Sequence, residues 1–290
     1  MFTHRLAVGT ALIALTLAVA WLDSAIEARV GAPGVAIAIA AAPVLIVCAM
    51  ELAAMLRARG ARISDALAIF SALSGLAIGA VTALAPNADR AGALSIPLLA
   101  LWLLLTLITI AAPRRTNGAL ASAGAAALVL ILIGVIPSSF LVLRQHETAW
   151  TVIALVLITK SSDIGAYFVG TTIGRNKLIP WLSPDKTWEG LVGAMAAAAL
   201  VGAGVAGLST IDGLATVIAF PLGPIAAAGV GAGLAVVGQA GDLTISLFKR
   251  DAGLKDSSGL FPGMGGALDV IDSLLFIGPA AHWLLVVIST

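Results

Sequence analysis

Residues 93–112 read ALSIPLLALWLLLTLITIAA and contain no charged side chain. A helix needs about 20 mostly apolar residues to cross the hydrocarbon core of a bilayer, and this stretch has that length. The rest of the chain is similar, since 60% of its 290 residues are hydrophobic, 11% are charged and the mean hydropathy is +1.08. Soluble domains average about 45–50% apolar and about 25% charged residues. Lipid must therefore be the solvent for most of this protein.

Similar apolar stretches recur along the whole chain, and they set the expected fold class. We expect an all-α, polytopic transmembrane helical protein of about nine spans. The expected spans are residues 6–25, 34–56, 63–85, 93–112, 119–142, 149–170, 190–208, 224–248 and 267–288. Residues 210–223 are apolar but short and broken by Pro and Gly, so eight to ten spans are compatible with the sequence. The run after Arg5 could be a signal peptide, but its recurrence and the lack of a small-residue cleavage site favour a first span.

The basic residues concentrate in alternate loops, which predicts the orientation of the chain. The loops after the second, fourth, sixth and eighth spans contain Arg57, Arg59, Arg62, Arg114, Arg115, Arg175, Lys177, Lys186, Lys249, Arg250 and Lys255. The opposite loops contain only Arg29, Arg90 and Arg144, each with an acid nearby. Because short cytoplasmic loops are enriched in Lys and Arg, we expect the even loops and the N-terminus in the cytoplasm and the C-terminus outside.

Two bulk features exclude other kinds of partner and site. The net charge is only +1, which argues against nucleic acid as a partner. Cys48 is the only cysteine of the sequence, so neither an intrachain disulfide nor a metal site built from cysteines can form.

The two halves of the chain use their acidic residues differently. Those of the first half fall at span ends and are interpreted as interfacial: Asp23, Glu27, Glu51, Asp65, Asp89 and Glu147. In the second half, Asp163, Asp242, Asp269 and Asp272 lie inside expected spans near their cytoplasmic ends, and Lys160 precedes Asp163 by about one turn. Ionisable groups inside spans are expensive and usually functional. We therefore expect residues 1–147 to form scaffold spans and residues 148–290 to form the catalytic transmembrane region with its cytoplasmic loops.

Residues 241–273, GDLTISLFKRDAGLKDSSGLFPGMGGALDVIDS, combine these acids with cations and glycines. Asp242, Ser246 and Lys249 are spaced i, i+4 and i+7, so they share one helix face. Carboxylates that converge without enough cations indicate a hard metal ion such as Mg²⁺, which takes oxygen ligands. The cations Lys249, Arg250 and Lys255 suit phosphate. Glycines would let backbone N–H groups approach an anion at the start of the last span: Gly259, Gly263, Gly265 and Gly266.

A second polar block, SPDKTWEG, occupies residues 183–190 between two expected spans. Ser183 precedes a proline and is typical of a turn or a helix N-cap. The side chains of Lys186, Thr187 and Glu189 are suited to the phosphates or the sugar of a nucleotide. An ordinary loop that caps the next span would have a similar composition.

Together these segments resemble the phosphatidate cytidylyltransferase family, the CDP-diacylglycerol synthases, over about residues 150–290. The signature of that family has the form S-x-x-K-R-x4-K-D, then P-G-H-G-G, then D-R-x-D. The matching residues are Asp163, Gly165, Ala166, Tyr167, Ser183, Pro184, Lys186, Thr187, Glu189, Gly190, Gly241, Asp242, Leu243, Ser246, Lys249, Arg250, Lys255, Asp256, Pro262, Gly263, Gly265, Gly266, Asp269 and Asp272. Three positions depart from the pattern, because Met264 replaces a histidine, Val270 replaces an arginine and Asp185 replaces a basic or amide residue.

The resemblance implies an enzyme that joins CTP and phosphatidate to give CDP-diacylglycerol and pyrophosphate. The implied metal ligands for Mg²⁺ are Asp242, Asp269 and Asp163, the last in or near the outer shell with Asp272. The implied catalytic residues are Asp272, Lys255 and Asp256. The implied substrate-binding residues are Ser183, Lys186, Thr187, Glu189, Ser246, Lys249, Arg250, Gly263, Gly265 and Gly266. The expected location is a bacterial inner (plasma) membrane with the active site facing the cytoplasm, and a homodimer is compatible with the many small residues in the spans.

The nucleophile of that reaction is a phosphate oxygen that is already ionised at neutral pH. No general base is therefore needed, and the loss of histidine at position 264 is compatible with activity.

Two other functions fit parts of the sequence. An ion-coupled transporter would explain acids and Gly or Pro breaks within spans, although the acids gather near one face and the halves show no repeat. A CTP-dependent lipid or polyprenol kinase would need a similar metal and phosphate site.

Overall fold

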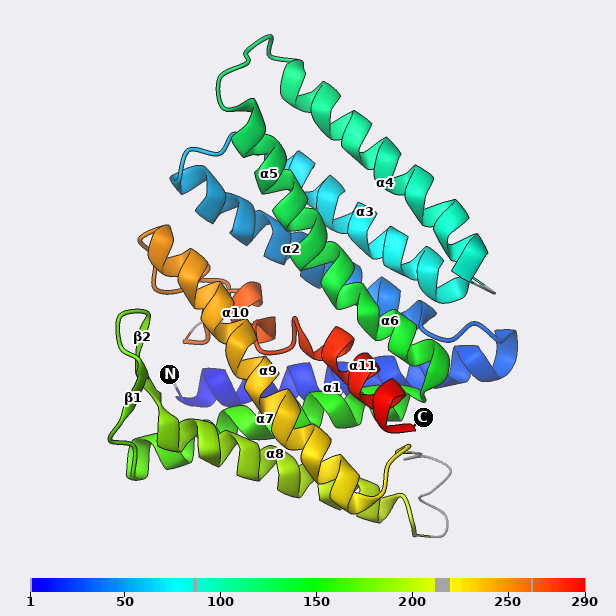
Figure 1. The fold of residues 1–290 in the computed structure, drawn as a ribbon, viewed down its shortest axis with the longest axis vertical. Coiled ribbons are helices and arrows are strands. Elements are labelled where there is room, and N and C mark those ends of the chain that lie inside the picture. Colours follow the sequence, from blue (N-terminus) through cyan, green and yellow to red (C-terminus); the bar gives the residue numbers. More distant parts are fainter. Residues whose placement is uncertain (1, 86–87, 212–219, 262, 290) are drawn as a thin grey trace. The chain divides into compact units, whose positions relative to one another are not determined.

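The computed structural model describes residues 2–85, 88–211, 220–261 and 263–289, and these are almost entirely helical (Figure 1). The helices are α1 (Phe2–Val30), α2 (Val35–Ala58), α3 (Asp65–Leu84), α4 (Ala88–Ala111), α5 (Ala119–Val129), α6 (Ile136–His146), α7 (Ala149–Thr172), α8 (Trp188–Leu208), α9 (Pro224–Asp251), α10 (Ala267–Ile271) and α11 (Ile277–Ser289). A π-helical segment, η1 (Leu130–Val135), joins α5 to α6. Two short strands, β1 (Lys177–Ile179) and β2 (Ser183–Thr187), follow α7.

Eight helices of the described residues are long and apolar enough to cross a membrane, which confirms the expected all-α membrane class. They match the first eight expected spans, with α5, η1 and α6 forming one continuous span from Ala119 to His146. The expected ninth span is divided into α10 and α11 by residues 272–276. With 13 residues, α11 is about 20 Å long, which is less than the hydrocarbon thickness of a bilayer. Most of the ambiguous stretch 210–223 lies outside the described residues.

The chain forms two compact units, which we describe separately. The first contains Met1–Gln145 and Phe248–Ile271, and the second contains His146–Leu247 and Asp272–Thr290. The chain passes from the second unit to the first within α9, and it returns directly after α10. The end of α9 and the glycine-rich segment after it are therefore grouped with the N-terminal spans.

In the first unit, α3 packs against α2, α4 and η1 (Figure 1). Glycine allows α3 to approach η1 closely, because a Cβ atom added to Gly75 would lie 2.5 Å from the Leu130 carbonyl oxygen and 2.7 Å from Gly134 Cα. Asp23 of α1 is fully buried and is not the interfacial acid that its place at a span end indicated. It accepts hydrogen bonds from Arg144 Nε (2.7 Å) and from the backbone N–H of Ala36 (3.0 Å), and so ties α1 to α6 and to the start of α2.

In the second unit, α7 and α8 pack along each other through small residues. A Cβ atom on Gly165 would lie 2.5 Å from the Gly193 carbonyl oxygen, so the helices approach to backbone contact. The connection between them is a hairpin in which Lys177 pairs with Thr187 and Ile179 with Ser183. The sequence predicted a loop at this position, and the hairpin gives the second polar block a fixed geometry.

Candidate active site

In the first unit, the centre of the predicted site is an ion pair between Lys249, at the end of α9, and Asp269, in α10. Lys249 Nζ lies 2.6 Å from Asp269 Oδ1, and the two side chains are only 10% and 8% exposed. The other oxygen of Asp269 accepts hydrogen bonds from Ser257 N (2.7 Å), Ser257 Oγ (2.8 Å) and Gly266 N (2.9 Å). Burial raises the pKa of the Asp269 carboxyl, but the hydrogen bonds from Lys249, Gly266 and Ser257 outweigh burial and hold the pKa below its ordinary value. The Asp269 carboxylate is therefore bound by four donors.

A second carboxylate, Glu51 of α2, binds the same glycine-rich segment. Glu51 Oε1 accepts hydrogen bonds from Ser258 Oγ (2.6 Å) and Ala267 N (3.0 Å), and Oε2 accepts them from Ser257 Oγ (2.9 Å) and Leu268 N (2.8 Å). Glu51 is 6% exposed, so its interpretation as an interfacial acid is wrong. The sequence contained a usable signal, because Glu51 lies inside the expected span 34–56 and the rule applied to the later acids applies to it equally.

The paired glycines of the signature are explained by these two carboxylates. Gly265 has a φ of +89°, which L-residues rarely adopt, and a Cβ atom there would meet the Asp269 carboxylate. A Cβ atom on Gly266 would meet both Ser257 Oγ and Glu51 Oε1. The N–H groups at the start of α10 are thus directed at the protein's own carboxylates, and not at the substrate anion that the sequence analysis expected for them.

A polar cavity of about 300 Å³ lies beside this segment. It is lined by Lys255, Asp256, Ser258, Gly259, Phe261, Gly263, Met264 and Gly265. The cavity therefore contains four of the predicted site residues, together with the methionine that stands where the family has histidine. Arg250 lies outside it and donates to the Leu254 carbonyl oxygen (2.9 Å). Pro262 lies outside the described residues.

In the second unit, three of the predicted acids lie in one cluster with two lysines. Lys186 of β2 forms an ion pair with Asp242 Oδ2, and Ser246 Oγ lies 3.3 Å from Asp242 Oδ1. On α7, Lys160 Nζ lies 3.2 Å from Asp163 Oδ2. The cluster thus combines three acids with two lysines.

The third acid, Asp272, is buried to 9% exposure and interacts electrostatically with Asp242, Asp163 and Lys160. Its Oδ1 accepts a hydrogen bond from Ser273 N (2.6 Å). The hydroxyl of Ser273 lies 2.9 Å from Lys160 Nζ and 3.1 Å from Asp163 Oδ2, so it links this turn to α7. Neither Lys160 nor Ser273 was among the predicted site residues.

The donor chemistry of this cluster fits a hard divalent cation in part. All its acidic ligands are carboxylate oxygens, which Mg²⁺ prefers. Within the described residues, however, no group of three Asp, Glu, His or Cys side chains is arranged to hold a metal ion. Mg²⁺ commonly takes only one or two carboxylates and completes its shell with substrate phosphates and waters. One or two carboxylates of this cluster would therefore suit a Mg²⁺ ion whose other ligands come from elsewhere, and Asp269, the third predicted ligand, belongs to the other unit.

The second polar block is ordered chiefly by its own contacts. Thr187, and not Ser183, is the N-cap of α8, because its side chain accepts a hydrogen bond from Gly190 N (3.0 Å). Ser183 is the first residue of β2. The exposed Glu189 accepts from Asn176 Nδ2 (2.7 Å), and hydrogen bonds from the backbone around it and from Asn176 fix the turn before β1. Lys186 is the residue of this block that reaches the acidic cluster.

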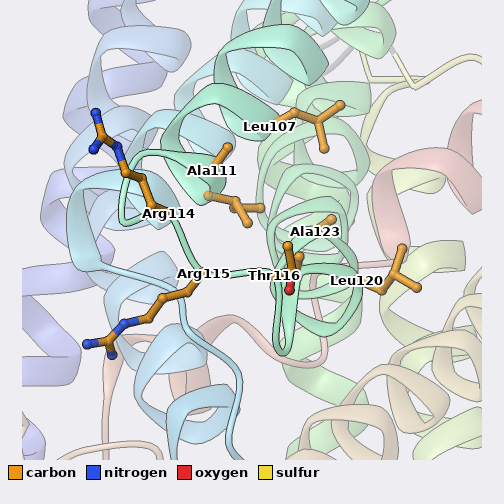
Figure 2. A pocket seen from close by; sticks show the side chains of 9 residues that line it. Leu107, Ala111, Arg114, Arg115, Thr116, Leu120 and Ala123 are labelled. Atoms are coloured by element: carbon orange, nitrogen blue, oxygen red, sulfur yellow. The ribbon is translucent and has the colours of Figure 1, made fainter.

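Another cavity of the first unit lies between the end of α4 and the start of α5, with a volume of about 370 Å³ (Figure 2). Its lining is mainly aliphatic and includes Leu107, Ala111 and Ala123. Figure 2 shows the side chains of Arg114 and Arg115 extending in the direction opposite to that of Leu120. This cavity contains none of the predicted site residues.

Comparison with known proteins gives concordant results. Residues 3–288 match the model of the cytidylyltransferase family. The chain is 38% identical over 189 residues to a phosphatidate cytidylyltransferase of Pseudomonas aeruginosa, a match that covers 63% of this chain and 65% of the relative. It is 36% identical over 206 residues to a phosphatidate cytidylyltransferase of Bacillus subtilis, covering 70% and 72%. A protein of the same name from Brucella suis is 42% identical over 125 residues, covering 43% of each chain.

Proposed function

Because this chain belongs to the cytidylyltransferase family, we propose that it is an integral membrane enzyme that joins CTP and phosphatidate to give CDP-diacylglycerol and pyrophosphate. The relatives named phosphatidate cytidylyltransferase support this choice of substrates. The observation that carries the proposal is the cluster of Asp163, Asp242 and Asp272 with two lysines.

The reaction requires positioning and charge neutralisation more than proton transfer. A phosphate oxygen of phosphatidate forms a bond to the α-phosphorus of CTP, and the bond from that phosphorus to the β-phosphate bridging oxygen breaks. The leaving group is pyrophosphate. Both reactants are anions, so the protein must overcome their repulsion, while the nucleophile is already ionised and needs no base.

The acidic cluster is the part of the proposed site that would hold Mg²⁺. Asp242 and Asp163 are the proposed ligands, with the buried Asp272 close to both. When bound, the metal would supply charge neutralisation at the CTP phosphates. Lys186 and Lys160, which pair with these acids, are placed to change partner and bind phosphate oxygens when the acids take the metal.

The residues of the first unit supply the other cations of the proposal. Lys255 lines the polar cavity and is proposed to bind a phosphate group there, with Asp256 beside it. Lys249 is held by Asp269, which fixes the direction of its ammonium group. A metal-binding role for Asp269 remains part of the proposal, and it would require Lys249 or Ser257 to release one carboxylate oxygen.

We propose further that the site faces the cytoplasm of a bacterial inner membrane, where CTP is available. The concentration of Lys and Arg in the even loops supports this orientation. Phosphatidate would enter from the cytoplasmic leaflet, with its acyl chains remaining in the bilayer. A homodimer is compatible with the many Gly and Ala residues of the spans.

The test is an assay of the protein purified in detergent with labelled CTP, Mg²⁺ and phosphatidate. We expect labelled CDP-diacylglycerol and pyrophosphate, and Asp242→Asn should lower their rate of formation at least about 100-fold. Phosphorylated lipid with CDP would indicate a CTP-dependent kinase instead. Substrate flux in liposomes without any CTP chemistry would indicate a transporter and would overturn the proposal.

A further inference from the structure

Glu51 connects the N-terminal spans to the glycine-rich segment, although the two are separated by more than 200 residues in the sequence. It lies in the C-terminal third of α2, in a stretch where Cys48, Ala49, Leu52 and Ala53 are completely buried. A buried carboxylate without partners is strongly unfavourable, so its presence in an apolar helix needs a physical reason.

The hydrogen bonds of Glu51 provide that reason. Each of its oxygens accepts from one serine hydroxyl and one backbone N–H, and all four donors belong to residues 257–268. The backbone donors, Ala267 and Leu268, are the first two residues of α10, so Glu51 caps this short helix from a different part of the chain. The carboxylate therefore specifies both where α10 begins and how the preceding loop returns to it.

Glu51 is also coupled to the ion pair of the first unit. The hydroxyl of Ser257 lies 2.9 Å from Glu51 Oε2 and 2.8 Å from Asp269 Oδ2, so the two carboxylates share one donor. Asp269 in turn fixes Lys249. Ser258, the other hydroxyl bound to Glu51, lines the polar cavity that contains Lys255. A displacement of Glu51 would therefore move both the Lys249–Asp269 pair and one wall of the cavity.

We propose that Glu51 is a positioning residue for the cytidylyl transfer, which holds residues 257–268 so that Lys249, Asp269 and the cavity around Lys255 keep their geometry. This inference rests on the proposed function. Glu51 itself touches no substrate group in this mechanism. Its effect is exerted through the loop, and small losses of alignment at transferring phosphates reduce rates strongly.

The test compares Glu51→Gln with Asp23→Asn at equal amounts of folded protein. Glu51→Gln keeps the side-chain shape but presents an amide N–H₂ to donor groups. Asp23 is a matched control, since it is a buried carboxylate of the same unit that also accepts backbone N–H groups but does not contact the glycine-rich segment. In Glu51→Gln we expect kcat to fall at least about 30-fold, while KM for CTP stays within about 3-fold of wild type. In Asp23→Asn we expect kcat to stay within about 3-fold of wild type.

Hydrogen exchange of the purified proteins supplies a readout that does not depend on catalysis. Peptides covering residues 257–268 should exchange faster in Glu51→Gln, while those covering α3 and α4 should be unchanged. Normal kcat and unchanged exchange in folded Glu51→Gln would overturn the inference.

If Glu51→Gln does not fold, Ser257→Ala carries the same test. We then expect a loss of about 5-fold in kcat and faster exchange in the same peptides. An inactive wild-type protein would refute the proposed function, whereas the exchange result would still report on the contact made by Glu51.

Discussion

Asp269 is the residue on which most interactions of the first unit's site converge, because it accepts from one ammonium group, one hydroxyl and two backbone N–H groups. A buried carboxylate with this number of donors is stable as an anion, and its removal takes the acceptor from Lys249 and from the two backbone N–H groups. The loss is largest for Lys249, which is almost as buried as Asp269.

Asp269→Asn should therefore lower kcat/KM at least about 100-fold, which corresponds to about 3 kcal/mol of transition-state stabilisation. The measurement is CDP-diacylglycerol formation by the purified variant. Asp251→Asn is the control, because Asp251 is a nearby acid whose ion pair with Arg59 is exposed, and its activity should stay within about 2-fold of wild type. Near-normal turnover of Asp269→Asn would remove this residue from the site.

Met264 tests whether the reaction needs a general base. It lines the polar cavity at the position where the family has histidine, and the nucleophile of the proposed reaction is already ionised. Met264→His should therefore leave kcat within about 3-fold of wild type. The pH profile of the variant between pH 6 and 8 should have the same shape as that of wild type. A large gain in activity that follows histidine deprotonation would show that the natural protein is limited by a missing base.

At the scale of elements, the contact between α7 and α8 depends on glycine at backbone distance. A Cβ atom on Gly165 would lie 2.5 Å from the Gly193 carbonyl oxygen and 2.6 Å from Ala197 Cβ. In lipid, apolar side chains gain little from leaving the bilayer, so close van der Waals packing of this kind contributes much of the association between helices. The contact also fixes Asp163, which lies two residues before Gly165 on α7.

Gly165→Ala should therefore destabilise the protein by about 1–3 kcal/mol, which is the usual penalty for overpacking. Gly204→Ala on α8 is the matched control, because a Cβ atom there has no neighbour within 4 Å and alanine favours the helix. The measurement is thermal unfolding in detergent, where only Gly165→Ala should lower Tm. Equal Tm values for the two variants would mean that α7 and α8 can accommodate the added methyl group at Gly165 without loss of stability.

Element boundaries were predictable from the sequence wherever the signal was an apolar run. The eight long helices follow such runs to within a few residues, as α4 (Ala88–Ala111) does for the expected span 93–112. The β1–β2 hairpin was not predictable, because a polar block such as SPDKT has no alternation of apolar residues to indicate strands. The break between α10 and α11 was not predictable either, because residues 272–276 contain three large apolar residues and continue the apolar run of the expected span.

At the scale of the whole molecule, the predicted site residues are divided between two compact units. Of the four acids predicted to converge, Asp163, Asp242 and Asp272 lie in one cluster and Asp269 belongs to the other unit. Glu51 also lies inside an expected span, but its partners are more than 200 positions away and cannot be found from spacing. The predicted scaffold half therefore supplies a direct partner of the signature segment.

The orientation of the chain is the remaining prediction at this scale, and it determines which compartment supplies CTP. Single cysteines at Asn117 and Ala28, in a Cys48→Ala background, would place one exposed probe after the fourth span and one at the end of the first. Since Arg114 and Arg115 mark the Asn117 loop as cytoplasmic, a membrane-impermeant maleimide should label Ala28→Cys in intact cells and Asn117→Cys only in permeabilised cells. The reverse pattern would place the basic loops, and with them Lys186 and Lys255, on the side of the membrane that lacks CTP. In that case the proposed reaction could not take place in the cell, whatever the purified protein does.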